Sequence, residues 1–206
     1  MNSPTALKRA VFGVIINLMS QAHNYLCLVL KTKHYRERDL LVTLVTREHG
    51  RIIVNAQGVR KLNSRKKAAL EVGNLIHAQL VTTKNMPLLT QAQLVSDSID
   101  VRQNLTSMRR FLLFLEILDR LLVSEQLDDE LFDKIIYLRQ LLIAGVNNNL
   151  VRQHFTEILR LLGFAYDGSQ TLSITGQVNQ ILDSSLRSFD YLTVETTVDQ
   201  QPANSH

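Results

Sequence analysis

Cysteine, tryptophan and proline are nearly absent from this chain, whose 206 residues include one Cys, no Trp and three Pro. The single cysteine, Cys27, excludes an internal disulfide framework and a zinc site built from several thiolates, so we expect no metal and no cofactor. Such sparing use of cysteine fits a reducing compartment, and we expect a cytoplasmic protein. The longest apolar run near the start, residues 10–19, is too short to cross a bilayer, which takes about 20 residues.

Sequence motifs of the common enzyme classes are also missing. The chain has no phosphate-binding glycine loop, no dinucleotide fingerprint, no HExxH and no GxSxG. The acidic residues 128–130 open a helical pattern, where carboxylates cap the helix and complement its dipole. The six histidines include no pair at i, i+4. We therefore predict no catalytic residues and a protein that is not an enzyme.

Acidic residues are scarce in the first half of the chain, and basic residues are the minority in the second half. Residues 1–96 contain 14 Lys and Arg against 4 Asp and Glu, a net of +10, whereas residues 97–206 contain 9 against 15, a net of −6. A basic half followed by an acidic half predicts two domains with different partners, and the basic half suits a polyanion.

The first 24 residues are expected to form a leader. Lys8 and Arg9 precede the apolar run and a small-residue stretch follows it, as in a signal peptide. The alternative is an amphipathic or disordered leader, which agrees better with a cytoplasmic protein.

Residues 25–96 have the two-residue period of β-strands. The pattern predicts five short strands, at 25–33, 39–47, 51–58, 74–84 and 88–95. One long connection, residues 59–73, separates the third strand from the fourth and has room for a short helix capped by Ser64. Five strands with a helix at this point are the layout of an OB-fold barrel; an SH3-like barrel is the nearest competitor but lacks the long connection. The predicted fold class is thus α+β in two domains.

The period changes after residue 96, and residues 97–192 are predicted to form an all-α domain. Helices are expected at 105–125, 128–145 and 149–164, the last capped by Asn149, with a weaker helix at 176–189. The buried stripe of the first is predicted from its spacing to be Leu105, Met108, Leu112, Leu115, Leu118 and Leu122. The polar tail, residues 193–206, is expected to be disordered.

The connection 59–70, VRKLNSRKKAAL, is the strongest functional signal in the chain. It holds five basic residues and no acid, next to strands and loops that border the nucleic-acid groove of OB-folds. With only Tyr25 and Tyr35 available for stacking in the predicted barrel, binding should depend mainly on phosphates, vary strongly with salt and ignore sequence. The predicted DNA-binding residues are Arg36, Arg38, Arg47, Arg51, Arg60, Lys61, Arg65, Lys66, Lys67 and Lys84.

Several short motifs in this half resemble the N-terminal domain of the RecO family of bacterial recombination mediators. They are Y-x-E-x-D at residues 35–39, T-x-E-x-G at residues 46–50, and G-x-R at residues 58–60, followed by Ser64 and Arg65. They occur in order and at the family's spacing. The family's four-cysteine zinc module, expected shortly after the Leu-Gly-Phe at 162–164, has no counterpart here, so the resemblance does not imply a zinc site in this chain.

The resemblance implies a protein of recombinational DNA repair in the RecF pathway. Such proteins bind single- and double-stranded DNA, anneal complementary strands, bind RecR and the acidic C-terminal tail of the single-stranded DNA-binding protein, and help to load RecA, in association with the nucleoid. Candidates for the tail site in the acidic half are Arg109, Arg110, Arg120 and Arg139; the alternative is that these arginines pair with Glu116, Asp119 or Asp133. From the residues alone, an RNA-binding module or a protein scaffold acting through its helical half remains open.

Overall fold

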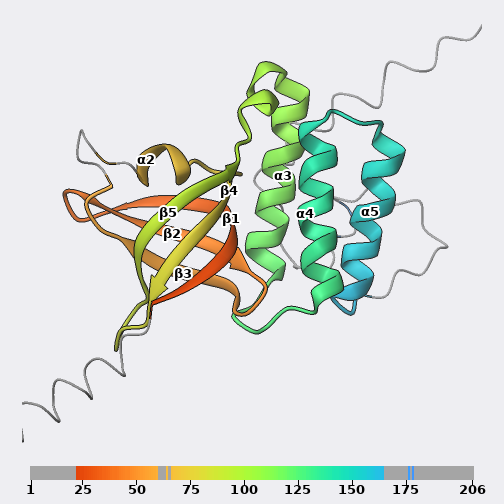
Figure 1. Ribbon diagram of the computed structural model, residues 1–206. Coiled ribbons are helices and arrows are strands. Elements are labelled where there is room, and N and C mark those ends of the chain that lie inside the picture. Colours follow the sequence, from red (N-terminus) through yellow and green to blue (C-terminus); the bar gives the residue numbers. More distant parts are fainter. Residues whose placement is uncertain (1–21, 60–63, 65, 165–175, 177, 179–206) are drawn as a thin grey trace, which may run out of the picture. The chain divides into compact units, whose positions relative to one another are not determined.

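The structure, a computed structural model, describes residues 22–59, 64, 66–164, 176 and 178 (Figure 1). The chain divides into two compact units. The first, which we call the barrel domain, comprises Met1–Asp97 together with Val123–Leu127. The second, the helical domain, comprises Ser98–Leu122 and Asp128–His206.

The barrel domain is built from five strands, and it is an OB-fold as predicted. They are β1 (Ala22–Tyr35), β2 (Asp39–Thr46), β3 (Gly50–Ala56), β4 (Leu75–Val81) and β5 (Leu88–Ser96). They close in the order β1-β2-β3-β5-β4, with β1 long enough to pair with β2 through one half and with β4 through the other. The only parallel pair among the described strands is β3 with β5, which meet at Asn55–Leu88 and Ala56–Leu89. β1 begins at Ala22, three residues before the predicted start.

The alternation that predicted the strands also identifies the barrel core. On β4, Ile76, Ala78 and Leu80 are buried while His77 is exposed. The core is completed by apolar residues from the other strands and by Val59, Ala69 and Leu70 of the long connection. That connection carries the predicted short helix, α2 (Lys66–Ala69).

The turn between β2 and β3 receives a segment from far along the chain. Residues 123–127 run along it: the N–H of Arg51 donates to the carbonyl of Val123 (2.9 Å), and the N–H of Leu127 donates to the carbonyl of Arg47 (2.8 Å). Gly50, at φ +57°, lies under this segment, and a Cβ there would collide with the carbonyl oxygens of Val123 and Glu125. The predicted first helix therefore stops at Leu121 rather than at residue 125, because the chain becomes extended and joins the barrel domain.

The helical domain contains the short 3-10 helix η1 (Ile99–Gln103) and three α-helices. These are α3 (Leu105–Leu121), α4 (Asp129–Ile143) and α5 (Asn148–Leu161). Side chains of Asn104, Asp128 and Asn147 cap α3, α4 and α5 by accepting bonds from backbone N–H groups of the first turn. The prediction of Asn149 as the cap of α5 is wrong, because the helix starts earlier and Asn149 donates its N–H to the side chain of Asn147.

The predicted buried stripe of α3 is wrong in its first half. Leu105, Met108 and Leu112 are 63%, 37% and 40% exposed. Phe111 and Phe114 are buried instead, and the ring of Phe114 packs edge-on against that of Phe155 on α5, with centroids 6.0 Å apart. Apolar residues surround most of this helix, so spacing alone could not tell which side faces the core.

Several predicted features lie outside the described residues: most of the leader, most of the weak helix at 176–189, and the tail from 193. None of the helices that the structure describes is long and apolar enough to cross a membrane.

Candidate nucleic-acid interface

The turn between β1 and β2 carries two of the predicted basic residues, Arg36 and Arg38, and both are exposed. Arg36 adopts φ 53°, a left-handed conformation that is uncommon for a residue with a side chain. Its guanidinium lies 5.2 Å from the centroid of the Tyr35 ring, in cation–π geometry. The turn therefore presents two positive side chains beside one aromatic ring.

Strand register brings this turn close to the long connection after β3. Tyr35 pairs with Asp39 at the tip, and Leu40 pairs with Ala56 at the end of β3. The Asp39 carboxylate accepts a bond of 2.9 Å from the N–H of Gly58, which has φ +66°. Asp39 ends the first family-like motif and Gly58 begins the third. Together, these two motif residues hold the connection against the turn.

The β4–β5 loop leads into the start of β5, which lies beside the end of β3 and beside α2. It closes at Pro87, whose carbonyl accepts a bond of 2.9 Å from the N–H of Asn55 on β3. Lys84 is exposed in this loop, and Lys67 is exposed on α2. We call the set Arg36, Arg38, Lys66, Lys67 and Lys84 the basic end.

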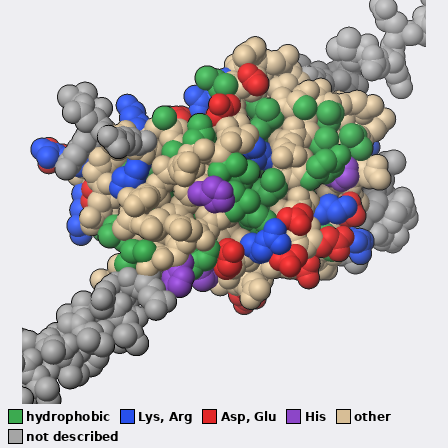
Figure 2. Space-filling view, viewed as in Figure 1, with side chains coloured by type: hydrophobic (Ala, Val, Ile, Leu, Met, Phe, Trp, Pro, Cys, Tyr) green, Lys and Arg blue, Asp and Glu red, His purple; other side chains and the backbone are tan. Residues whose placement is uncertain are grey.

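Figure 2 shows several Lys and Arg side chains on the part of the surface that carries the β1–β2 turn and α2. Three further predicted residues, Arg60, Lys61 and Arg65, belong to the connection but lie outside the described residues.

Lys66 differs from its exposed neighbour. Its ammonium donates to the carbonyl oxygens of Gln57 (2.9 Å) and Leu89 (3.4 Å). Burial lowers the pKa of Lys66 below its usual value, while the nearby Asp39 carboxylate acts in the opposite direction. Two of its three donors are thus directed at the barrel.

Arg47 and Arg51 lie at the opposite end of the barrel, around the β2–β3 turn. The eight residues of β2 separate them from the β1–β2 turn, roughly 25 Å at about 3.3 Å per residue. Their backbones hold residues 123–127, and Glu48 lies in the same turn. The structure therefore divides the predicted set into two groups that cannot contact the same short stretch of a nucleic acid.

The second candidate for stacking, Tyr25, lies away from the basic end. Its hydroxyl is 3.1 Å from Nε2 of His49, and the two rings meet edge to face with centroids 5.0 Å apart. Burial, followed by the negative charge of Glu48, raises the pKa of Tyr25. Tyr25 also packs against the barrel core, so its ring has a structural role.

Our prediction from the sequence did not include two further contributions to this site: the lysines of β1, and the hydrogen bonds made by Asp39 and Asn74. Lys31 and Lys33 are exposed on β1, leading toward the turn, and their alternation along the strand was the signal that could have found them. Asp39 and Asn74 hold the connection through hydrogen bonds; the amide of Asn74 donates to the carbonyls of Ala68 (3.0 Å) and Ala69 (3.3 Å) at the end of α2. The bond between Asp39 and Gly58 joins residues 19 positions apart, and such a bond has no signature in a single sequence.

In the helical domain, the predicted arginines have different surroundings. Arg139 is fully buried, so it does not present its guanidinium to a partner, and its inclusion in the tail site is wrong. Arg120 forms an ion pair of 2.8 Å with Glu116 one turn earlier, which is the alternative considered from the sequence. Arg109 and Arg110 are half-buried on α3, between the exposed Leu105, Met108 and Leu112.

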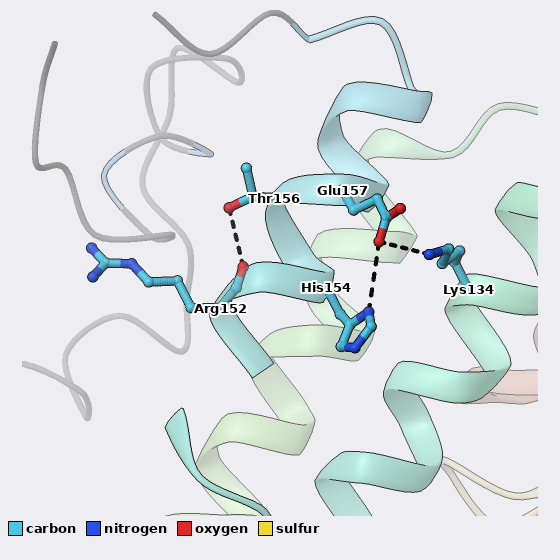
Figure 3. A network of polar contacts seen from close by, with 5 residues as sticks. All are labelled: Lys134, Arg152, His154, Thr156 and Glu157. Carbon is cyan, nitrogen blue, oxygen red and sulfur yellow. Dashed lines mark hydrogen bonds and ion pairs between the residues drawn. The ribbon is translucent and has the colours of Figure 1, made fainter. Parts of the chain in front are cut away.

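Another polar network joins α4 and α5. Lys134 on α4 lies 2.7 Å from the carboxylate of Glu157 on α5, and Nδ1 of His154 lies 3.7 Å from the same oxygen (Figure 3). The hydrogen bond from Lys134 lowers the pKa of Glu157 below its usual value. Within the described part of the chain, no group of three or more His, Cys, Asp and Glu side chains is placed to hold a metal ion.

Comparison with known proteins finds one family model, described as "Recombination protein O N terminal", that matches residues 19–97. Similar curated proteins are named DNA repair protein RecO. The one from Symbiobacterium thermophilum is 26% identical over 66% of this chain and 55% of its own length. The one from Geobacter sulfurreducens is 31% identical over 66% of this chain and 56% of its own, and that from Bacillus subtilis is 28% identical over 66% and 52%. The matched part of the chain spans about half the length of these relatives.

Proposed function

We propose that the chain belongs to the RecO family, whose N-terminal model matches residues 19–97, and that it is a DNA-binding protein of DNA repair that acts without catalysing a reaction of its own. The observation that carries the proposal is the basic end. It gathers positive side chains from the β1–β2 turn, α2 and the β4–β5 loop on an OB-fold, a barrel that commonly binds oligonucleotides through its loops.

The chemistry of the basic end favours contact with phosphates over contact with bases. Among the described residues at this end, Tyr35 is the one aromatic side chain, and Arg36 lies over its ring. Base stacking is worth about 1–3 kcal/mol per base, so one ring contributes little beside several phosphate contacts. A surface that holds backbones and leaves bases free permits two complementary strands to meet. We therefore propose that the protein binds single- and double-stranded DNA and anneals complementary strands.

The remaining roles belong to the same proposal. The protein would act in the cytoplasm, in association with the nucleoid and within the RecF pathway, bind RecR, and help to load RecA onto strands coated by the single-stranded DNA-binding protein. The support for these roles is the similarity to RecO proteins alone, and the matched part spans about half of each relative.

Strand annealing is the direct test. Two complementary oligonucleotides, one carrying a fluorophore and the other a quencher, are mixed with and without the full chain, first bare and then coated by the cognate single-stranded DNA-binding protein. We expect faster annealing in both cases. A parallel titration with RNA of the same sequence separates DNA repair from an RNA-binding function: tighter binding to RNA together with no annealing of DNA would contradict the proposal.

For the acidic tail of the single-stranded DNA-binding protein, we propose the exposed face of α3. Leu105, Met108 and Leu112 follow one another at spacings of three and four, and Arg109 lies between them in sequence. Such a face offers apolar contact to a hydrophobic residue of the tail and a positive charge to its carboxylates, which helps to offset the net negative charge of this half.

A fluorescent tail peptide titrated against the full chain tests this assignment. Met108→Gln and Arg109→Gln should each weaken binding, because each removes one of the two interactions. Arg152→Gln serves as the control, because Arg152 is exposed on α5 and its replacement removes the same charge as Arg109→Gln. Weakening by Arg152→Gln as large as that by Arg109→Gln would reveal a general charge effect, and unchanged binding in Met108→Gln would show that the tail does not contact the apolar residues of α3; either result would refute the α3 site.

A further inference from the structure

The helix α2 is attached to the barrel through the side chain of its first residue. The ammonium of Lys66 donates to the carbonyl of Gln57, which follows β3, and to the carbonyl of Leu89 on β5. One carbonyl lies directly after β3 and the other lies on β5, and these two strands close the barrel by pairing in parallel at Asn55–Leu88 and Ala56–Leu89. Lys66 therefore bridges the end of β3 and the start of β5, at the point where the barrel closes.

The neighbouring contacts act on the same piece of chain. The carboxylate of Asp39 holds the N–H of Gly58, one residue after Gln57, and the amide of Asn74 holds the last carbonyls of α2. Ala69 and Leu70 are buried in the barrel core. The start and end of α2 are thus fixed by separate hydrogen bonds, and Lys66 supplies those at the start.

We propose that Lys66 is a positioning residue, which fixes α2 and thereby holds the exposed Lys67 at the basic end, and that it is not itself a contact for phosphate. The expected effect on DNA affinity rests on the proposed function, but the attachment of α2 to the barrel can be measured without DNA. It separates two adjacent lysines of the same charge into different roles: Lys66 is directed to carbonyl oxygens of the barrel, and Lys67 to solvent.

The difference can be measured through the salt dependence of binding. Each phosphate contact on a single strand contributes about 0.7 to the slope of log K against log salt. A residue that only positions another changes the affinity but leaves the number of released counterions nearly the same. Lys66→Met and Lys67→Met are matched variants, because each removes one charge from the same helix.

The experiment measures binding of the full-length protein to a fluorescent oligothymidine over a range of salt concentrations, together with hydrogen exchange in the absence of DNA. We expect Lys66→Met to weaken binding about fivefold at each salt concentration, the effect of one net hydrogen bond, with an unchanged slope. It should also speed the exchange of the Leu70 N–H, which donates to the carbonyl of Lys66. Lys67→Met should make the slope shallower by about 0.7 and leave exchange in α2 unchanged.

Two results would overturn the inference. A slope that falls as much in Lys66→Met as in Lys67→Met would make Lys66 a phosphate contact, and unchanged exchange in α2 would show that Lys66 does not hold the helix. A wild-type protein that binds no DNA would instead refute the proposed function, and the exchange measurement alone would then decide whether Lys66 anchors α2.

Discussion

Replacement of Gly50 by alanine should destabilise the barrel domain far more than the addition of one methyl group suggests. Gly50 has φ +57°, where an L-residue pays about 1–2 kcal/mol. A Cβ at this position also collides with two backbone carbonyl oxygens, of Val123 and Glu125. Backbone cannot rotate aside as a flexible side chain does, so residues 123–127 must move.

That movement would break the bonds between the segment and the β2–β3 turn. The two backbone bonds, from Arg51 to Val123 and from Leu127 to Arg47, are each worth about 1 kcal/mol net. The hydrogen bond of 2.6 Å that the Ser124 hydroxyl donates to the carbonyl of Arg51 would be lost with them. Together with the conformational strain, we expect Gly50→Ala to lower the free energy of unfolding by about 3–5 kcal/mol.

Gly145 provides a matched control. It has φ +66°, close to that of Gly50, but apart from its chain neighbours no described residue comes within 4 Å of a Cβ added there. Gly145→Ala should therefore cost about 1–2 kcal/mol, the conformational part alone. Urea denaturation measures both changes. Hydrogen exchange of the Arg51 and Leu127 amides then shows whether segment 123–127 has detached in Gly50→Ala. Equal losses in the two variants, with both amides still protected, would refute the steric reasoning.

Two further predictions concern single ionisable groups. The hydrogen bond from Lys134 lowers the pKa of Glu157, so the ionised carboxylate stabilises the folded protein at pH values above the usual Glu pKa of about 4.3, and this stabilisation is lost as the pH falls through the lowered pKa. Acidification should therefore destabilise the wild type more than Glu157→Gln, and identical stability profiles of the two proteins in acid would contradict this. Burial, with a smaller contribution from Glu48, raises the pKa of the Cys27 thiol, so alkylation by iodoacetamide at pH 8 should be slow in the folded protein and fast in urea; rapid alkylation without urea would contradict the buried position.

The strands and their faces could be predicted because their signal is local. Ile76, Ala78 and Leu80 alternate with polar residues on β4, and this period-two pattern survives in the structure as a buried and an exposed face. The buried face of α3 could not be predicted in the same way. Its apolar residues nearly encircle the helix, and the packing of Phe114 against Phe155, 41 residues later, decides which side is covered.

The candidate site was predictable in composition but not in arrangement. The charge pattern identified the basic residues, and the predicted strand 39–47 already separates Arg38 from Arg47. Only the register of β1, β2 and β3 shows that Arg38 lies beside the connection that follows β3. The different roles of Lys66 and Lys67 depend on carbonyls at residues 57 and 89, which come close only when the barrel closes. Motif residues such as Asp39 and Gly50 were recognised by resemblance, and their physical roles became visible only in three dimensions.

If DNA contacts the basic end of the barrel, the charges at that end must determine how binding depends on salt. Two variants are compared with the wild type on single-stranded DNA: Arg36→Gln/Arg38→Gln/Lys67→Gln at the basic end, and Arg47→Gln/Arg51→Gln at the opposite end. We predict that the slope of log K against log salt becomes shallower by about 2 in the first variant, at about 0.7 per lost contact, and stays unchanged in the second. A slope that changes in the second variant and not in the first would place the DNA at the other end of the barrel and refute binding at the basic end.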